Sequence, residues 1–129
     1  MIRAQALSKK FAAIEAVRDF SFQVEKGEVV ALLGPNGAGK TSCMRMLSGY
    51  LRPDSGYALI DGHDSHADPL AAKRHLGYLA EHAPVYKEHH VLYYLNFVAR
   101  ARGLPKAKAQ TAVDDVFQSL NLNSIAFQP

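Results

Sequence analysis

Hydrophobic and polar residues alternate along the stretch DFSFQV, in which Phe20, Phe22 and Val24 are the apolar positions. This period of two predicts a strand with one buried face. A tight turn is expected at Lys26–Gly27, and residues 29–33 (VVALL) are then continuously apolar. A continuous apolar run of this length, placed after a turn, predicts a strand buried on both faces.

Two other segments have the composition of short strands, YALI at 57–60 and LGYLA at 76–80. Between the apolar run and these segments, residues 39–48 have helical spacing, and Gly49 is expected to end that helix. Its buried face is expected to carry three residues, Cys43, Met46 and Leu47.

A second, short helix is expected to start at Asp68 and Pro69, because Asp is a good N-cap and Pro suits the first helical position. Beyond residue 90 the spacing becomes helical again, and Gly103 and Pro105 separate two helices. The apolar face of the first helix is Val91, Leu95, Val98 and Ala99. That of the second is Ala109, Ala112, Val113, Val116, Phe117 and Leu120.

The composition is that of one globular domain, with 129 residues, 48% hydrophobic and 21% charged. The net charge of +3 comes from basic residues spread along the chain, so we expect no nucleic-acid partner. Cys43 is the only cysteine, which excludes an internal disulfide and suits a reducing compartment. With no apolar run long enough to span a bilayer and no secretory signal at its start, we expect a soluble, cytoplasmic chain.

A glycine-rich loop follows the apolar run and precedes the first helix. Gly34, Gly39, Lys40 and Thr41 satisfy the pattern G-x-x-x-x-G-K-[ST], whose amides cradle phosphates at a helix N-terminus. Lys40 would reach the β- and γ-phosphates, and the Thr41 hydroxyl would bind Mg²⁺. The residues expected to bind ATP here are Gly34, Pro35, Asn36, Gly37, Ala38, Gly39, Lys40, Thr41 and Ser42.

The residues on both sides of this loop also have a recognisable pattern. The stretches VEKGEVVALL, GPNGAGKTS, MLSGYLRPDSGYALIDGHD and LGYLAEHAPVY together resemble the ATP-binding subunit of ABC transporters, from residue 1 to about 122. The resemblance implies an α/β fold with a P-loop NTPase core and an N-terminal antiparallel β subdomain in residues 1–80. Residues 81–129 would hold the Q-loop region and the start of a helical subdomain.

The same resemblance implies three further site residues. Phe11 lies where the family has an aromatic residue that stacks on adenine, and Ala16 lies on the ribose side. Glu81 stands where the family has a glutamine that touches Mg²⁺ and the attacking water. The alternative interpretation of Phe11 is a core or surface phenylalanine at a strand end, and that of Glu81 is a solvated surface glutamate.

Partners also follow from the resemblance: transmembrane subunits, a second ATP-binding subunit, and a position on the cytoplasmic face of the cell membrane. Four aromatic residues in the helical part are candidate contacts with the membrane partner, although their spacing also suits a core: Tyr86, Tyr93, Tyr94 and Phe97. No nucleic acid is expected.

The rest of the family's catalytic apparatus is absent from the sequence. There is no signature motif, no apolar strand that ends in Asp-Glu (Walker B) and no switch histidine, so we expect truncation before these motifs. Asp114 and Asp115 are acidic neighbours, but they lie in a segment with helical spacing. The six histidines, His63, His66, His75, His82, His89 and His90, favour scattered loop positions over a metal site.

The sequence therefore predicts the ATP-binding component of an ABC transporter, which uses Mg-ATP to energise transport, with hydrolysis requiring residues that this chain lacks. A non-hydrolysing nucleotide- or partner-binding module and a non-transport ABC ATPase are the alternatives. A P-loop nucleotide kinase or a GTPase is disfavoured, because the sequence has neither an arginine lid nor an N-K-x-D motif.

Overall fold

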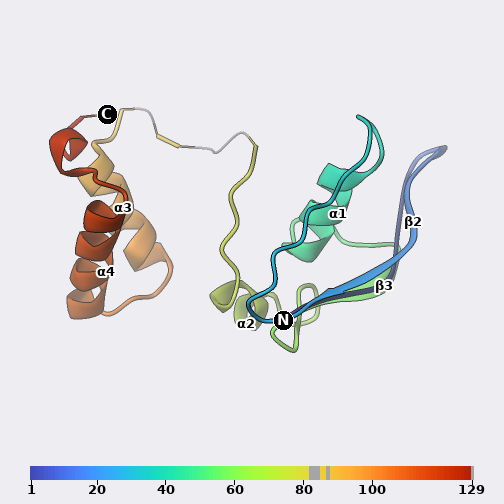
Figure 1. The fold of residues 1–129 in the computed structure, drawn as a ribbon. Coiled ribbons are helices and arrows are strands. Elements are labelled where there is room, and N and C mark those ends of the chain that lie inside the picture. Colours follow the sequence, from blue (N-terminus) through green and yellow to red (C-terminus); the bar gives the residue numbers. More distant parts are fainter. Residues whose placement is uncertain (82–84, 87, 129) are drawn as a thin grey trace. The chain divides into compact units, whose positions relative to one another are not determined.

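A computed structural model of the chain describes residues 1–81, 85–86 and 88–128. It consists of two compact units, Met1–Leu79 and Ala80–Pro129 (Figure 1). The first unit contains a sheet with two helices, and the regular elements in the described residues of the second unit are helices.

The sheet of the first unit has four strands in the order β2-β1-β3-β4, and every neighbouring pair is antiparallel. The strands are β1 (Ile2–Phe11), β2 (Ile14–Val24), β3 (Ser55–Ile60) and β4 (His63–Asp64). The expected strands around 20–24 and 57–60 are therefore confirmed as parts of β2 and β3. The sequence pattern did not predict β1, because a bulge interrupts its alternation: Ala6 has φ 50°, and Ala4 and Leu7, three positions apart, are both buried.

Helix α1 (Lys40–Leu47) supplies one side of the core of the first unit. Its three expected inward residues, Cys43, Met46 and Leu47, are all buried. They pack with residues from the three long strands, Ala4, Leu7, Val17 and Ala58. Leu7 and Met46 are completely inaccessible to solvent, so the helix that follows the glycine-rich loop is anchored on the sheet.

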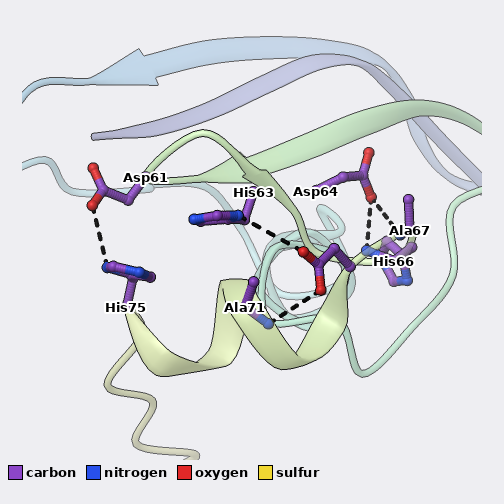
Figure 2. Close-up of polar contacts among 8 residues, drawn as sticks. Asp61, His63, Asp64, His66, Ala67, Ala71 and His75 are labelled. Carbon is purple, nitrogen blue, oxygen red and sulfur yellow. Dashed lines mark hydrogen bonds and ion pairs between the residues drawn. The ribbon is translucent and has the colours of Figure 1, made fainter.

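Helix α2 (Pro69–Arg74) begins as expected, with Pro69 at its start and the Asp68 carboxylate accepting a hydrogen bond from the Ala71 N–H at 3.3 Å. Two histidine–aspartate contacts lie at its ends (Figure 2). His63 approaches Asp68 at 3.8 Å, and His75 approaches Asp61 at 3.2 Å. The helix is thereby attached to the β3–β4 hairpin.

Two expected strands are wrong. Residues 29–33 and 76–80 form no strand, and 29–33 is the exposed coil that leads to the loop before α1 (Figure 1). Val29 is 97% exposed and Leu33 is 87% exposed, where burial on both faces was expected. A strand exists only when a neighbour accepts and donates its main-chain hydrogen bonds. No main-chain group of residues 29–33 makes such a bond within the described part of the chain.

The second unit contains α3 (Val91–Ala101), α4 (Lys106–Ser119) and a short 3₁₀ helix, η1 (Asn123–Ile125). The two expected helices are confirmed, and the core between them is Ala99, Ala109, Val113 and Phe117. Leu120 was expected in this core but is 64% exposed, because α4 ends at Ser119. No helix in the described residues is both long and apolar enough to cross a membrane.

Candidate functional site

The glycine-rich loop leads directly into α1, and its backbone needs glycine. Gly37 and Gly39 have φ values of 85° and 83°, a region that side chains disfavour. At Gly39 space is limiting as well, because a Cβ atom would lie 2.1 Å from the carbonyl oxygen of Ala16 in β2. Gly39 therefore holds the loop closely against β2.

The main chain of the loop presents unpaired hydrogen-bond donors. Among the described residues, no acceptor is found for seven N–H groups, those of Gly34, Asn36, Gly37, Gly39, Lys40, Thr41 and Ser42. The last three belong to the first turn of α1, where N–H groups have no partner within the helix and the helix dipole is positive. Donors of this kind, in a loop before a helix, form an anion site.

The Lys40 side chain folds back over the same loop. Its Nζ donates to the carbonyl oxygens of Gly34 at 2.6 Å and of Pro35 at 2.7 Å. These two bonds hold the ammonium charge beside the unpaired amides. An arriving phosphate would therefore meet a positive charge and free N–H donors together.

The expected role of Thr41 at Mg²⁺ stays a prediction, and its surroundings are compatible with it. It is exposed at the start of α1, and among the described residues its hydroxyl is not one of those that make a hydrogen bond. Mg²⁺ in nucleotide sites keeps several waters and takes only one or two ligands from the protein, the others being phosphate oxygens. A single free hydroxyl beside a phosphate loop is enough for that coordination.

Phe11 and Ala16 lie on the β1–β2 hairpin. Phe11 pairs with Ile14 at its tip and is 46% exposed, so it lies on the surface at a strand end, a position that the alternative interpretation also allows. Ala16 is half-buried, and its carbonyl faces Gly39, so the structure brings this residue against the phosphate loop. Stacking of Phe11 on adenine and contact of Ala16 with ribose stay predictions.

Glu81 and the four aromatic residues lie in the second unit. Glu81 is exposed, and its role at Mg²⁺ stays a prediction. Tyr93 is 61% exposed and Phe97 is 50% exposed, so they are not core residues, whereas Tyr94 is half-buried. Tyr86 packs against His89 and Phe97, with ring centroids 5.4 and 6.4 Å apart.

Three histidines gather near α2 and β4 (Figure 2). The rings of His63 and His75 stack with centroids 5.3 Å apart, and His66 Nε2 lies 3.0 Å from the Met46 carbonyl oxygen. No group of three or more His, Cys, Asp or Glu residues in the described ranges is arranged to hold a metal ion. His82 lies outside the described residues.

Two side chains in the first unit have shifted pKa values. Burial in the core raises the pKa of the Cys43 thiol to about 11. The pKa of Asp54 is lowered, first by the hydrogen bond from the Lys9 side chain and then by that from the Lys10 N–H. The sequence gives no signal for the contact between Asp54 and Lys9, because the two residues lie 45 positions apart and no local pattern connects them.

With this geometry established, comparison with known proteins identifies the family. A family model described as "ABC transporter" matches residues 17–129. This chain belongs to the ABC transporter family. The match confirms the family expected from the resemblance.

Individual proteins are similar over nearly the whole chain. The "Probable multidrug ABC transporter ATP-binding protein YbhF" of Escherichia coli (strain K12) is 36% identical over 126 residues, 98% of this chain and 22% of that protein. The "Uncharacterized ABC transporter ATP-binding protein YxlF" of Bacillus subtilis (strain 168) is 36% identical over 126 residues, 98% of this chain and 41% of that protein.

A solved structure has the same fold as this chain. The "Structure of ATP binding subunit of ABC transporter" superposes with a TM-score of 0.86 and 28% identity, covering 98% of this chain and 53% of the other. The expected α/β fold of an ABC ATPase is confirmed. The chain spans less than half of each of the two curated relatives and about half of the solved chain.

Proposed function

We propose that this chain binds Mg-ATP through residues 34–42, as the ATP-binding component of an ABC transporter that hydrolyses ATP to drive transport across a membrane. The observation that carries the proposal is the set of unpaired amides beside the Lys40 ammonium. Charge-assisted hydrogen bonds from such donors are about twice as strong as neutral ones, and a triphosphate offers many acceptor oxygens.

The proposal assigns nucleotide binding, and not the hydrolytic step, to the residues of this chain. In-line attack on the γ-phosphate needs a group that orients the water. No described carboxylate or histidine ring makes a hydrogen bond or ion pair with residues 34–42. Thr41, and Glu81 in place of the usual glutamine, are the proposed protein ligands of Mg²⁺.

The proposed partners are transmembrane subunits and a second ATP-binding subunit, on the cytoplasmic face of the membrane. The exposed aromatic residues Tyr86, Tyr93 and Phe97 support a contact surface on the second unit. Exposed aromatic side chains of this kind are enriched where protein surfaces bind each other.

Titration calorimetry with Mg-ATP tests the phosphate site. Lys40→Ala removes the ammonium group, and we expect affinity to fall by about 10- to 100-fold, the range for a lost charged hydrogen bond. The matched control is Lys26→Ala, which removes the same charge from an exposed turn outside the loop. Equal affinity of Lys40→Ala and Lys26→Ala for Mg-ATP would contradict the proposal.

A further inference from the structure

The end of β1 carries Phe11, and the neighbouring Lys9 side chain reaches over its ring. Lys9 Nζ lies 5.9 Å from the ring centroid, within the range of a cation–π interaction. The Lys9 side chain is only 16% exposed, so the ammonium is held in place. Phe11 remains 46% exposed, which leaves ring surface open to a ligand.

Asp54, the residue directly before β3, holds this arrangement through bonds to β1. One carboxylate oxygen accepts from Lys9 Nζ at 2.7 Å, and the other accepts from the Lys10 N–H at 2.8 Å. The Asp54 N–H donates to the carbonyl oxygen of Ser8 at 2.9 Å. Asp54 is thus bonded to three consecutive residues immediately before Phe11.

These bonds continue the sheet where strand pairing stops. The pairing of β1 with β3 ends at Ser8 and Ser55, so Lys10 has no β3 residue opposite it. The carboxylate of Asp54 takes the place of that missing residue. The lowered pKa of Asp54 agrees with a carboxylate that stays ionised while it makes these bonds.

We propose that Lys9 and Asp54 are positioning residues that orient the Phe11 ring as a platform for the adenine base, which rests on the ATP-binding function proposed above. The ammonium restricts the Phe11 side chain before the nucleotide arrives, so less conformational entropy is lost when the base stacks. Asp54 holds the Lys9 ammonium and the β1 backbone in the positions that orient the Phe11 ring.

The test separates recognition of the base from recognition of the phosphates. Mg-ATP and magnesium tripolyphosphate are titrated into the wild-type chain and into Lys9→Met, Asp54→Asn and Lys10→Met. Lys10 is the matched control, because it is the adjacent lysine and its Nζ faces Glu15 at 3.7 Å. We expect Lys9→Met and Asp54→Asn to weaken Mg-ATP binding by about two- to fivefold, the range of an exposed cation–π contact.

Tripolyphosphate binding should be unchanged in Lys9→Met and Asp54→Asn, and Lys10→Met should change neither affinity. An equal loss for both ligands, or the same loss in Lys10→Met, would overturn the proposal, because the effect would then be one of general charge or stability. If the wild-type chain binds tripolyphosphate as tightly as Mg-ATP, the base is not recognised and only the phosphate site remains.

If neither ligand binds the wild-type chain, the proposed ATP-binding function itself fails, and this proposal with it. Lys9→Met keeps all the main-chain bonds of Asp54, so it remains informative if Asp54→Asn does not fold. Circular dichroism of each variant confirms that the sheet is intact.

Discussion

The first unit contains two kinds of apolar segment, and they differ in what surrounds them. Strands β1, β2 and β3 bury Ala4, Leu7, Val17 and Ala58 beneath α1. Residues 29–33 are more continuously apolar than any of these strands, and yet Val29 and Leu33 are almost fully exposed. Hydrophobicity therefore does not by itself decide which segment is buried.

The difference comes from the availability of a hydrogen-bonding neighbour. β1 ends at Phe11 and β2 begins at Ile14, so a hairpin of minimal length brings the two strands together. Residues 29–33 have no such neighbour among the described residues. Exposed apolar segments with unpaired main-chain groups attract other chains, because those groups are a template for strand pairing.

Leucine truncation is the strongest test of this comparison. Leu7→Ala removes a side chain with no solvent exposure, and we expect a loss of about 2–5 kcal/mol in the free energy of unfolding. Leu33→Ala removes the same atoms from a side chain that is 87% exposed, and the loss should be below about 0.5 kcal/mol. Urea denaturation followed by circular dichroism measures both, and equal losses would contradict the assignment of 29–33 as exposed.

Thiol reactivity compares the buried core with the exposed residues 29–33 in a second way, and we expect it to have a smaller effect than leucine truncation. Cys43 lies in the core with its pKa raised from 9.0 to about 11, so at neutral pH its thiolate fraction is about a hundredfold lower than that of an ordinary thiol. A cysteine at the exposed site, in the double variant Leu33→Cys, Cys43→Ala, should react at least a hundredfold faster with a disulfide reagent than wild-type Cys43.

The rates of reaction at Cys43 and at a cysteine in position 33 should depend on pH in the same direction. Both rates should rise with pH, because both thiols start protonated. The rate at position 33 should level off near pH 9, whereas that of Cys43 should continue to rise toward pH 11 while the chain stays folded. Cys43 reacting as fast as the exposed thiol near pH 8 would show that the core is open.

A charge placed on the exposed run should have the smallest effect on folding. Val29 is 97% exposed, so Val29→Lys should change the free energy of unfolding by less than about 0.5 kcal/mol. It should also lower aggregation, because a lysine in an exposed segment with unpaired main-chain groups opposes pairing with other chains. Light scattering and urea denaturation check the two parts, and a large loss of stability would mean that residues 29–33 are packed.

Elements with local signals were predicted correctly from the sequence. The glycines and Lys40 defined the loop, Gly49 ended α1, and Asp68 with Pro69 began α2. Each of these signals acts through residues a few positions apart. β1 was not predicted, because the bulge at Ala6 breaks the alternation of hydrophobic and polar residues. Leu120 was wrongly expected in the core of the second unit, because α4 ends one residue before it.

Contacts between distant residues could not be predicted in the same way. Asp54 contacts Lys9, which lies 45 positions away in the sequence. The carbonyl of Ala16, in β2, faces Gly39 in the glycine-rich loop. No periodic pattern in the sequence predicts either contact, because each contact depends on which strands pair and in which register.

The sequence alone determined the phosphate loop, the helix after it and the family, because glycine spacing and helix signals act within a few residues. Only the tertiary structure decided that Phe11 is half-exposed beside the Lys9 ammonium and that Asp54 fixes the end of β1. It also decided that residues 29–33 pair with no other segment in the described part of the chain. Burial and pairing depend on neighbours far along the chain, and local hydrophobicity cannot specify whether those neighbours are in place.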